Sequence, residues 1–75
     1  MKLTTIKSSN LHALGYDPTT QVLRVQFKGV GDKAGKVFEY AGVPPTKFAE
    51  MQAAPSVGSF FASKIRSAHK AKEVK

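Results

Sequence analysis

The sequence predicts an α+β fold, in which a three-stranded antiparallel β-meander is followed by two helices packed on one of its faces. Alternation over Gln21–Phe27 indicates the central strand, with Leu23, Val25 and Phe27 on one face and Val22, Arg24 and Gln26 on the other. Pro44 and Pro45 end the strand region, because proline cannot donate to a sheet ladder. Apolar residues at helical spacing after Ser56 indicate the helical layer. The expected order is therefore β-β-β-α-α around a single core.

Turns and loops separate the three expected strands, which span residues 11–16, 21–27 and 37–41. Asp17 followed by Pro18 suits a type I turn between the first two strands. The segment Lys28–Lys36 is rich in glycine, so we expect an open hairpin loop between the second and third strands.

Two helices are expected after the strands. Pro45–Ala53 starts with proline in its first turn and directs Phe48 and Met51 inward. Ser56 is the expected N-cap of the second helix. The apolar arc of this second helix, which sets its orientation on the sheet, consists of Val57, Phe60, Phe61, Ile65, Ala68 and Ala71.

Length and composition limit the function. The 75 residues include 12 Lys or Arg, 5 Asp or Glu and no cysteine, which gives a formal net charge of +7. A chain this short forms one small domain with little room for a large cofactor, and it has no disulfides or thiolate chemistry. We expect residues 1–10 to be a flexible N-terminal arm, residues 11–71 the domain and residues 72–75 a basic tail. Without a secretory signal or a membrane-length apolar run, a cytoplasmic location is expected.

Candidate catalytic and metal-binding patterns are weak. Gly29–Ala34 fits a permissive dinucleotide-binding pattern, but it leads into a strand instead of the helix that this chemistry needs. His12 and His69 are far apart and lack the short spacing of metal ligands. Glu39 and Glu50 show no pairing as catalytic carboxylates. We therefore predict no enzyme activity, no metal, no cofactor and no small-molecule substrate.

Positive charge is concentrated near the C-terminal end, where residues 57–75 hold five basic residues and one acid. Such a strip attracts polyanions, although cations near a helix C-terminus are also favourable without any ligand. As a nucleic-acid-binding face, it would place Arg66 and Lys70 on phosphates. Additional charge would come from Lys64, Lys72 and Lys75, and from Arg24 and Lys36 on the sheet. Neutralising three phosphates of a single strand predicts a salt slope of about −2.

The aromatic residues of the third strand have two interpretations. Phe38 and Tyr40 share a face, which suits either a platform for stacking unpaired bases or a buried core. Because the apolar residues of the central strand also need burial on this face, we expect them to be core. A membrane-surface helix is disfavoured, because Lys64 falls within the apolar arc.

Short motifs occur in a fixed order along residues 8–68. They are Gly15-Tyr16-Asp17, Leu23-x-Val25-x-Phe27, Phe38-x-Tyr40, Val43-Pro44, Ser56-x-Gly58-x-Phe60-Phe61 and Ile65-Arg66. Together they resemble the KTSC domain, a small module at the C-terminus of some lysyl-tRNA synthetases and a lone protein in bacteria and phages. The resemblance implies a family without an established activity, for which the synthetase context suggests RNA binding.

The positions that match the family pattern are Tyr16, Tyr40, Ser56, Gly58, Phe61 and Arg66. Phe38 departs from the family's Tyr-x-Tyr, which removes one hydroxyl, and the loop before it is longer than a tight hairpin. Helix capping, close packing and core filling account for Ser56, Gly58 and Phe61. Arg66 does not face the core, so it is the preferred functional residue.

These observations predict a non-enzymatic module that binds RNA or another nucleic acid through a basic C-terminal helix. The alternative is a protein-interaction module, such as a phage protein that acts on an acidic host protein.

Overall fold

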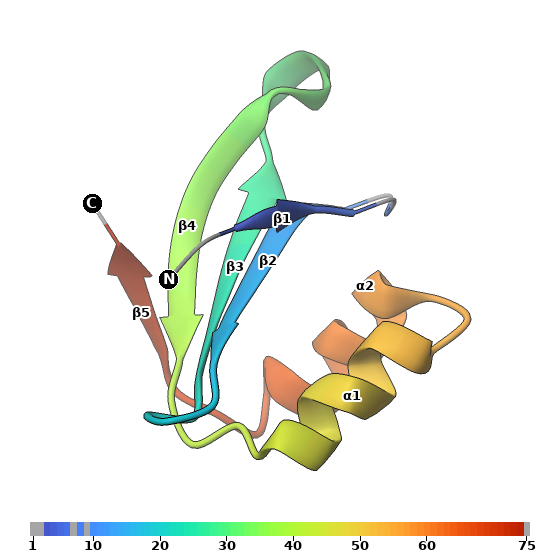
Figure 1. Cartoon of the computed structure of the whole chain (residues 1–75). Coiled ribbons are helices and arrows are strands. Elements are labelled where there is room, and N and C mark those ends of the chain that lie inside the picture. The colour runs from blue at the N-terminus through green and yellow to red at the C-terminus, as the bar shows by residue number, and fades with distance from the viewer. Residues whose placement is uncertain (1–2, 7, 9, 75) are drawn as a thin grey trace.

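The chain folds into a five-stranded antiparallel sheet with helices on one face (Figure 1). The computed structural model describes residues 3–6, 8 and 10–74, the side chain of Asp32 excepted. The strands neighbour one another in chain order and are β1 (Thr4–Thr5), β2 (Leu11–Asp17), β3 (Val22–Lys28), β4 (Ala34–Tyr40) and β5 (Ala71–Val74). The α+β class is confirmed, but the expected three-stranded meander is wrong, because one further strand pairs at each edge.

Both edge strands lie where the sequence indicated no sheet. Thr4–Thr5, in the expected N-terminal arm, pairs with β2. Ala71–Val74, expected as the end of the second helix and the start of the basic tail, pairs with β4. This pairing satisfies backbone donors and acceptors that β4 would otherwise expose at the sheet edge. Residues 1, 2, 7, 9 and 75 of the expected arm and tail lie outside the described residues.

The hairpin between β3 and β4 is tighter than expected. Its connection holds only a short 3-10 turn, η1 (Val30–Asp32), in which Gly31 has a left-handed φ of 68°. The open loop predicted over residues 28–36 is therefore wrong at both ends, because Lys28 ends β3 and Lys36 lies within β4. The cross-strand register also shifts between Gln26 and Lys28, at a bulge near this turn.

Close backbone approach makes Gly35 necessary at this hairpin. A Cβ atom at this position would lie 2.8 Å from the Phe27 carbonyl oxygen and 2.9 Å from the Gly29 nitrogen. Both are backbone atoms, so the Gly35→Ala variant requires a strand to shift, at a cost of about 1–3 kcal/mol. We expect a lower urea midpoint at an unchanged denaturant slope.

The control for Gly35→Ala is Gly31→Asn in the same hairpin. Open space surrounds Gly31, and asparagine tolerates its left-handed backbone, so this variant should lose less than about 1 kcal/mol. Equal midpoints for the two variants would contradict the requirement for close approach at Gly35.

The first helix, α1 (Pro45–Ala53), has the bounds predicted from the sequence. Within this helix, Met51 is fully buried, and the half-buried Phe48 ring stacks on Tyr16 with ring centroids 4.5 Å apart. The second helix, α2 (Val57–Phe60), starts at the predicted N-cap, where Ser56 Oγ accepts a hydrogen bond from the Ser59 N–H at 3.3 Å.

The second helix is much shorter than expected. It continues only as a π-helical turn, η2 (Phe61–Ile65), in which the Arg66 N–H donates to the Phe61 carbonyl at 2.9 Å. The expected continuation to Ala71 is wrong, because the chain turns after Ile65 and enters β5. Among the described residues, no helix has the length and apolarity needed to cross a membrane.

His69 fixes this turn between η2 and β5. Its Nδ1 lies 2.9 Å from the Ala41 carbonyl oxygen, and its Nε2 lies 3.1 Å from the Lys47 ammonium. A carbonyl oxygen and an ammonium group require a donor at Nδ1 and an acceptor at Nε2, which a neutral imidazole protonated at Nδ1 supplies. Lys47 also donates to the Lys64 carbonyl at 3.2 Å, so α1 and the end of η2 are held together.

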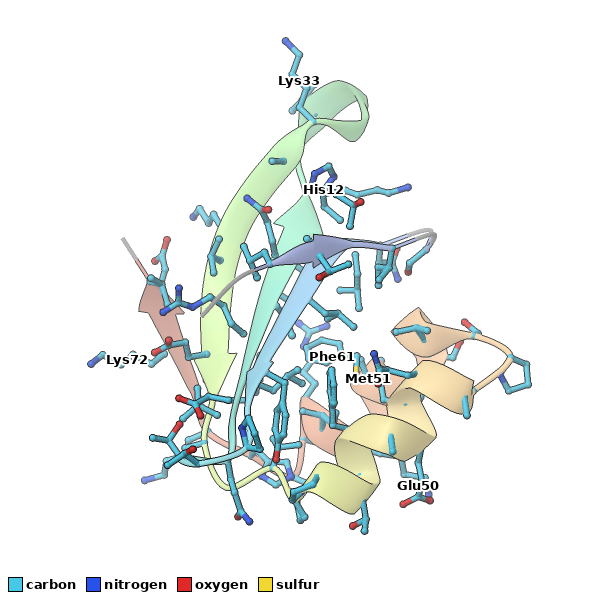
Figure 2. All side chains as sticks on the ribbon, viewed as in Figure 1. His12, Lys33, Glu50, Met51, Phe61 and Lys72 are labelled. Atoms are coloured by element: carbon cyan, nitrogen blue, oxygen red, sulfur yellow. The ribbon has the colours of Figure 1, made fainter. Side chains whose placement is uncertain are left out.

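The core lies between the helical layer and one face of the sheet. It consists of Leu11, Leu14, Leu23, Val25, Tyr40, Val43, Met51, Phe61 and Ile65. Figure 2 shows Met51 and Phe61 between the helices and the strands. The Phe61 ring therefore fills the core, as the sequence predicted, and Ile65 holds the π-helical turn against the sheet.

Candidate functional site

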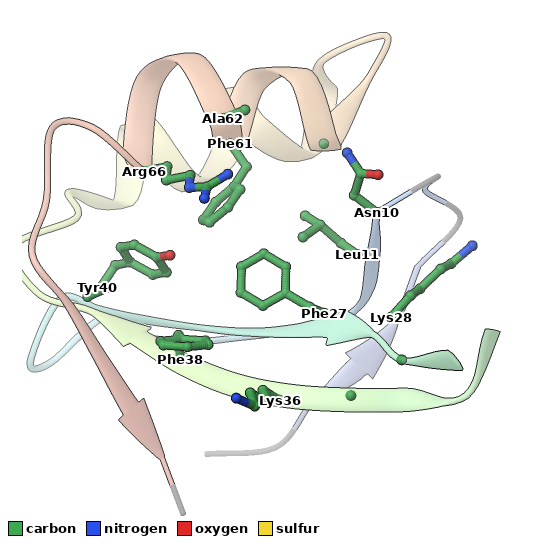
Figure 3. Close-up of a pocket in the computed structure, with 14 residues that line it drawn as sticks. Asn10, Leu11, Phe27, Lys28, Lys36, Phe38, Tyr40, Phe61, Ala62 and Arg66 are labelled. Carbon is green, nitrogen blue, oxygen red and sulfur yellow. The ribbon is translucent and has the colours of Figure 1, made fainter. Parts of the chain in front are cut away.

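A cavity of about 740 Å³ opens between η2 and the strands β3, β4 and β5 (Figure 3). Four aromatic rings line it: Phe27, Phe38, Tyr40 and Phe61. Alternation along each strand explains this grouping, because Phe38 and Tyr40 lie two residues apart in β4 and opposite Val25 and Leu23 on the core face of β3.

The four rings pack edge to face. Phe61 lies at the centre, with its ring centroid 5.1 Å from Tyr40 and 5.7 Å from Phe27. Phe27 in turn contacts Phe38 at 5.6 Å. Tyr40 and Phe61 are buried, whereas Phe27 and Phe38 remain half-buried. The cavity wall thus combines fixed core rings with two rings accessible to a ligand.

Cationic side chains surround these rings. Arg66, directly after η2, and Lys36, in β4, are both exposed and line the cavity, as does Lys28 at the end of β3. In Figure 3 the Arg66 side chain lies beside Phe61, on the helical side of the cavity. None of the carboxylates that the structure describes forms an ion pair with Arg66, so its charge remains available to an anion.

Tyr40 places a hydroxyl group in the same cavity. Burial raises the pKa of this phenol, while the nearby Arg66 guanidinium favours the phenolate and opposes the rise. The pKa remains above the ordinary value near 10, so the hydroxyl is protonated at neutral pH. Tyr40 can therefore donate a hydrogen bond to a ligand.

Small residues leave room between the helix and the sheet. Gly58 and Ala62 line the cavity from the helical side, and Ala71 lines it from β5. A Cβ atom at Gly58 would lie 3.0 Å from Ser8 Oγ, so the absence of a side chain permits the close packing predicted from the sequence.

Two of the predicted nucleic-acid contacts lie on the opposite face of the sheet. Arg24 forms an ion pair with Glu39, with Nε at 3.1 Å and Nη2 at 2.5 Å from the same carboxylate oxygen. Lys72 is the cross-strand neighbour of Glu39 and shares its face. Arg24 and Lys72 are therefore separated from Arg66 by the sheet, and the patch expected to run across it is not continuous.

Of the remaining predicted cations, Lys75 lies outside the described residues, and Lys64 and Lys70 do not line the cavity. Both side chains are exposed. Lys64 lies in η2, where its backbone carbonyl accepts a hydrogen bond from Lys47, and Lys70 lies between η2 and β5. The predicted basic helix is thus wrong as a single element. Arg66 and Lys36 are the two predicted nucleic-acid-binding cations that share the cavity.

Tyr16 has a structural contact outside this cavity. Its hydroxyl donates a hydrogen bond to the Val43 carbonyl oxygen at 2.5 Å, which ties β2 to the entry of α1. Tyr16 and Phe48 also line a second cavity of about 430 Å³, whose lining residues carry no charge. Among the described residues, no three His, Asp or Glu side chains gather as metal ligands.

Sequence reasoning missed the cavity and the part that Phe27 and Lys28 play in it. The signal that pointed to it was the shared parity of Lys36, Phe38 and Tyr40, which places a cation beside two rings on one strand face. Assigning Lys36 to a loop concealed that pattern.

These features define a class of small α+β domains, which have a five-stranded sheet and an aromatic cavity edged by cations. The chain belongs to the KTSC domain family, whose model matches residues 7–69. A crystal structure of a KTSC domain protein from Yersinia pestis is similar to the fold, with a TM-score of 0.86 and 27% sequence identity. That match covers 99% of this chain and 97% of the other.

Two bacterial sequences are also similar. An uncharacterized protein of Stutzerimonas stutzeri is 35% identical over 69 residues, which cover 92% of this chain and 90% of that protein. A protein of Tsukamurella paurometabola is 40% identical over 55 residues, which cover 73% and 75% of the two chains. The resemblance noted in the sequence is thereby confirmed at the level of the family.

Proposed function

We propose that this domain binds RNA or another nucleic acid, with Arg66 and Lys36 contacting phosphates at the aromatic cavity. The observation that carries the proposal is the placement of Arg66, an exposed guanidinium without a described carboxylate partner, beside rings in a cavity. Arginine suits this role because its planar fork donates two parallel hydrogen bonds to one phosphate. Proteins commonly bind single-stranded nucleic acids by combining cations, which contact phosphates, with accessible aromatic rings, on which bases stack.

The proposed role is binding and not catalysis. The proposed site consists of two cations, which hold phosphates in place, and aromatic rings, which supply apolar contact area. The net charge of +7 adds a long-range attraction that speeds encounter with a polyanion. Contacts to phosphates position a strand without reading its sequence, so we expect weak discrimination between sequences. A cytoplasmic site of action, where RNA is abundant, is part of the proposal.

Fluorescence anisotropy with a labelled oligouridylate tests the proposal. Two neutralised phosphates of a single strand predict a log–log salt slope of about −1.4, smaller in magnitude than three phosphates would give. A fourfold rise in NaCl should therefore weaken binding about sevenfold. Absence of binding at low salt, or binding that does not change with salt, would overturn it.

The competing class is a protein-interaction module that recognises an acidic partner. A peptide of consecutive glutamates, titrated under the same conditions, separates the two. Because a carboxylate peptide offers charge without flat bases, we expect it to bind more weakly than the oligouridylate. Tighter binding of the peptide would favour the protein-interaction module.

A further inference from the structure

Tyr40 combines a buried aromatic ring with a hydroxyl group that is accessible from the cavity. The residue is only 3% exposed, and its ring is held edge to face against Phe61. None of the residues that the structure describes exchanges a hydrogen bond with its hydroxyl. Figure 3 shows this hydroxyl directed into the cavity, on the side of Phe61 and Arg66. A donor that is accessible in a cavity and has no protein partner is suited to a ligand that brings an acceptor.

We infer that the cavity takes one unpaired nucleobase, with a base carbonyl accepting a hydrogen bond from the Tyr40 hydroxyl and the base ring against Phe27 and Phe38. This inference rests on the proposed nucleic-acid binding and names the part of the ligand that enters. The two half-buried rings offer the accessible aromatic surface, and the buried ring of Phe61 supports Phe27 from behind. Stacking on aromatic side chains is how unpaired bases are commonly held.

The cavity is large enough for this occupant, and its charged surroundings suit a nucleic-acid strand. Its volume of about 740 Å³ falls within the range of small-molecule sites. Arg66 and Lys36 approach it from opposite layers, the helical layer and the sheet, so the phosphates on either side of an inserted base meet a cation.

Insertion of a base requires a single strand. In a duplex the bases are stacked and paired, so removing one costs several kcal/mol before it contacts the protein. Unpaired bases in loops and single strands do not carry this cost. The cavity therefore selects single-stranded over double-stranded nucleic acid, although phosphate contacts alone would not distinguish them strongly.

An oligouridylate and a strand of the same length with abasic sites test the inference. Both carry the same phosphates, so the difference in affinity reports only on the base. We expect the base-containing strand to bind at least fivefold more tightly, in line with one stacked base. Uracil is a suitable probe because it presents carbonyl acceptors to Tyr40.

Two variants locate the inserted base. Tyr40→Phe removes only the hydroxyl and should weaken oligouridylate binding about three- to tenfold, the effect of one neutral hydrogen bond. Phe38→Leu keeps apolar bulk but removes the flat ring, and should weaken binding about fivefold. Neither variant should change the affinity for the abasic strand. Phe48→Leu is the matched control, because Phe48 is also half-buried but lies outside this cavity.

The outcomes separate this inference from the proposed function. Equal, salt-dependent affinity for the two strands would overturn base insertion and leave phosphate binding standing. Failure of both strands to bind would overturn the proposed function itself. An equal loss for Phe38→Leu and Phe48→Leu would place the effect in stability instead of the cavity, and would also contradict the inference.

Discussion

Replacing Ile65 by alanine is expected to lower the free energy of unfolding by about 3 kcal/mol. Ile65 is fully buried and closes the π-helical turn that holds Phe61 and Arg66 over the sheet. A domain of this length has a total stability of roughly 4–11 kcal/mol, so the loss is a large fraction of it. The melting temperature should fall by about 12–24 °C, which thermal unfolding followed by circular dichroism measures directly.

The control for Ile65→Ala is Val30→Ala. Val30 is 94% exposed at the tip of the β3–β4 hairpin, so its truncation should change stability by less than about 0.5 kcal/mol. A melting temperature for Ile65→Ala within a few degrees of the unaltered protein would mean that η2 does not anchor the helical layer.

Replacing Arg66 by glutamine is expected to produce the largest loss of nucleic-acid binding among single-charge variants. The variant removes one charge-assisted phosphate contact, so affinity should fall at least tenfold, because a hydrogen bond to a charged group contributes about 1.5–3 kcal/mol. The log–log salt slope should also become smaller in magnitude by about 0.7. Arg66 is exposed and outside the core, so the fold should be retained.

Lys72→Gln is the matched control for Arg66→Gln, because it makes the same change in net charge on the opposite face of the sheet. Salt screens charges beyond about 10 Å at moderate ionic strength, so this control should alter affinity less than twofold. Equal losses for the two variants would show that net charge, and not the cavity, governs binding.

The elements with strong local signals were predictable from the sequence. Alternation located β3, proline and periodicity located α1, and Ser56 was identified as a helix cap from its residue type and its place after the break at Pro55. Each of these signals acts within a few residues, where local conformational preference and tertiary structure agree.

The end of the chain was mispredicted because two effects compete there. The segment Ala71–Val74 contains alanine, lysine and glutamate, which favour helix by intrinsic propensity. Pairing with the edge of β4 supplies backbone hydrogen bonds and outweighs that preference. The register between β5 and β4 depends on the residue at which the preceding turn ends, and the local sequence does not show that residue.

The candidate site was only partly predictable for a related reason. A helical wheel assumes a constant rotation per residue, and the π-helical turn at Phe61–Ile65 breaks that assumption just before Arg66. The wheel correctly kept Arg66 out of the core, but it grouped that residue with Lys70, which lies beyond the helix. Charge counts could not separate the two sheet faces, so Arg24 and Lys72 were joined to a patch from which the sheet divides them.

The aromatic residues of β4 combine the two roles that the sequence posed as alternatives. Tyr40 is buried, as expected of a core residue, yet its hydroxyl reaches the cavity. Phe38 is half-buried and remains accessible, as expected of a stacking surface. The gap between the helical layer and β4 makes both possible, and only the folded arrangement reveals it.

Amide chemical-shift perturbation with a short oligouridylate tests the central claim most directly, because it reports where on the molecule the strand binds. The account predicts that the largest shifts occur at Lys36, Phe38, Tyr40, Ala62 and Arg66, around the aromatic cavity. Shifts concentrated on Arg24, Glu39 and Lys72, across the opposite face of the sheet, would contradict it.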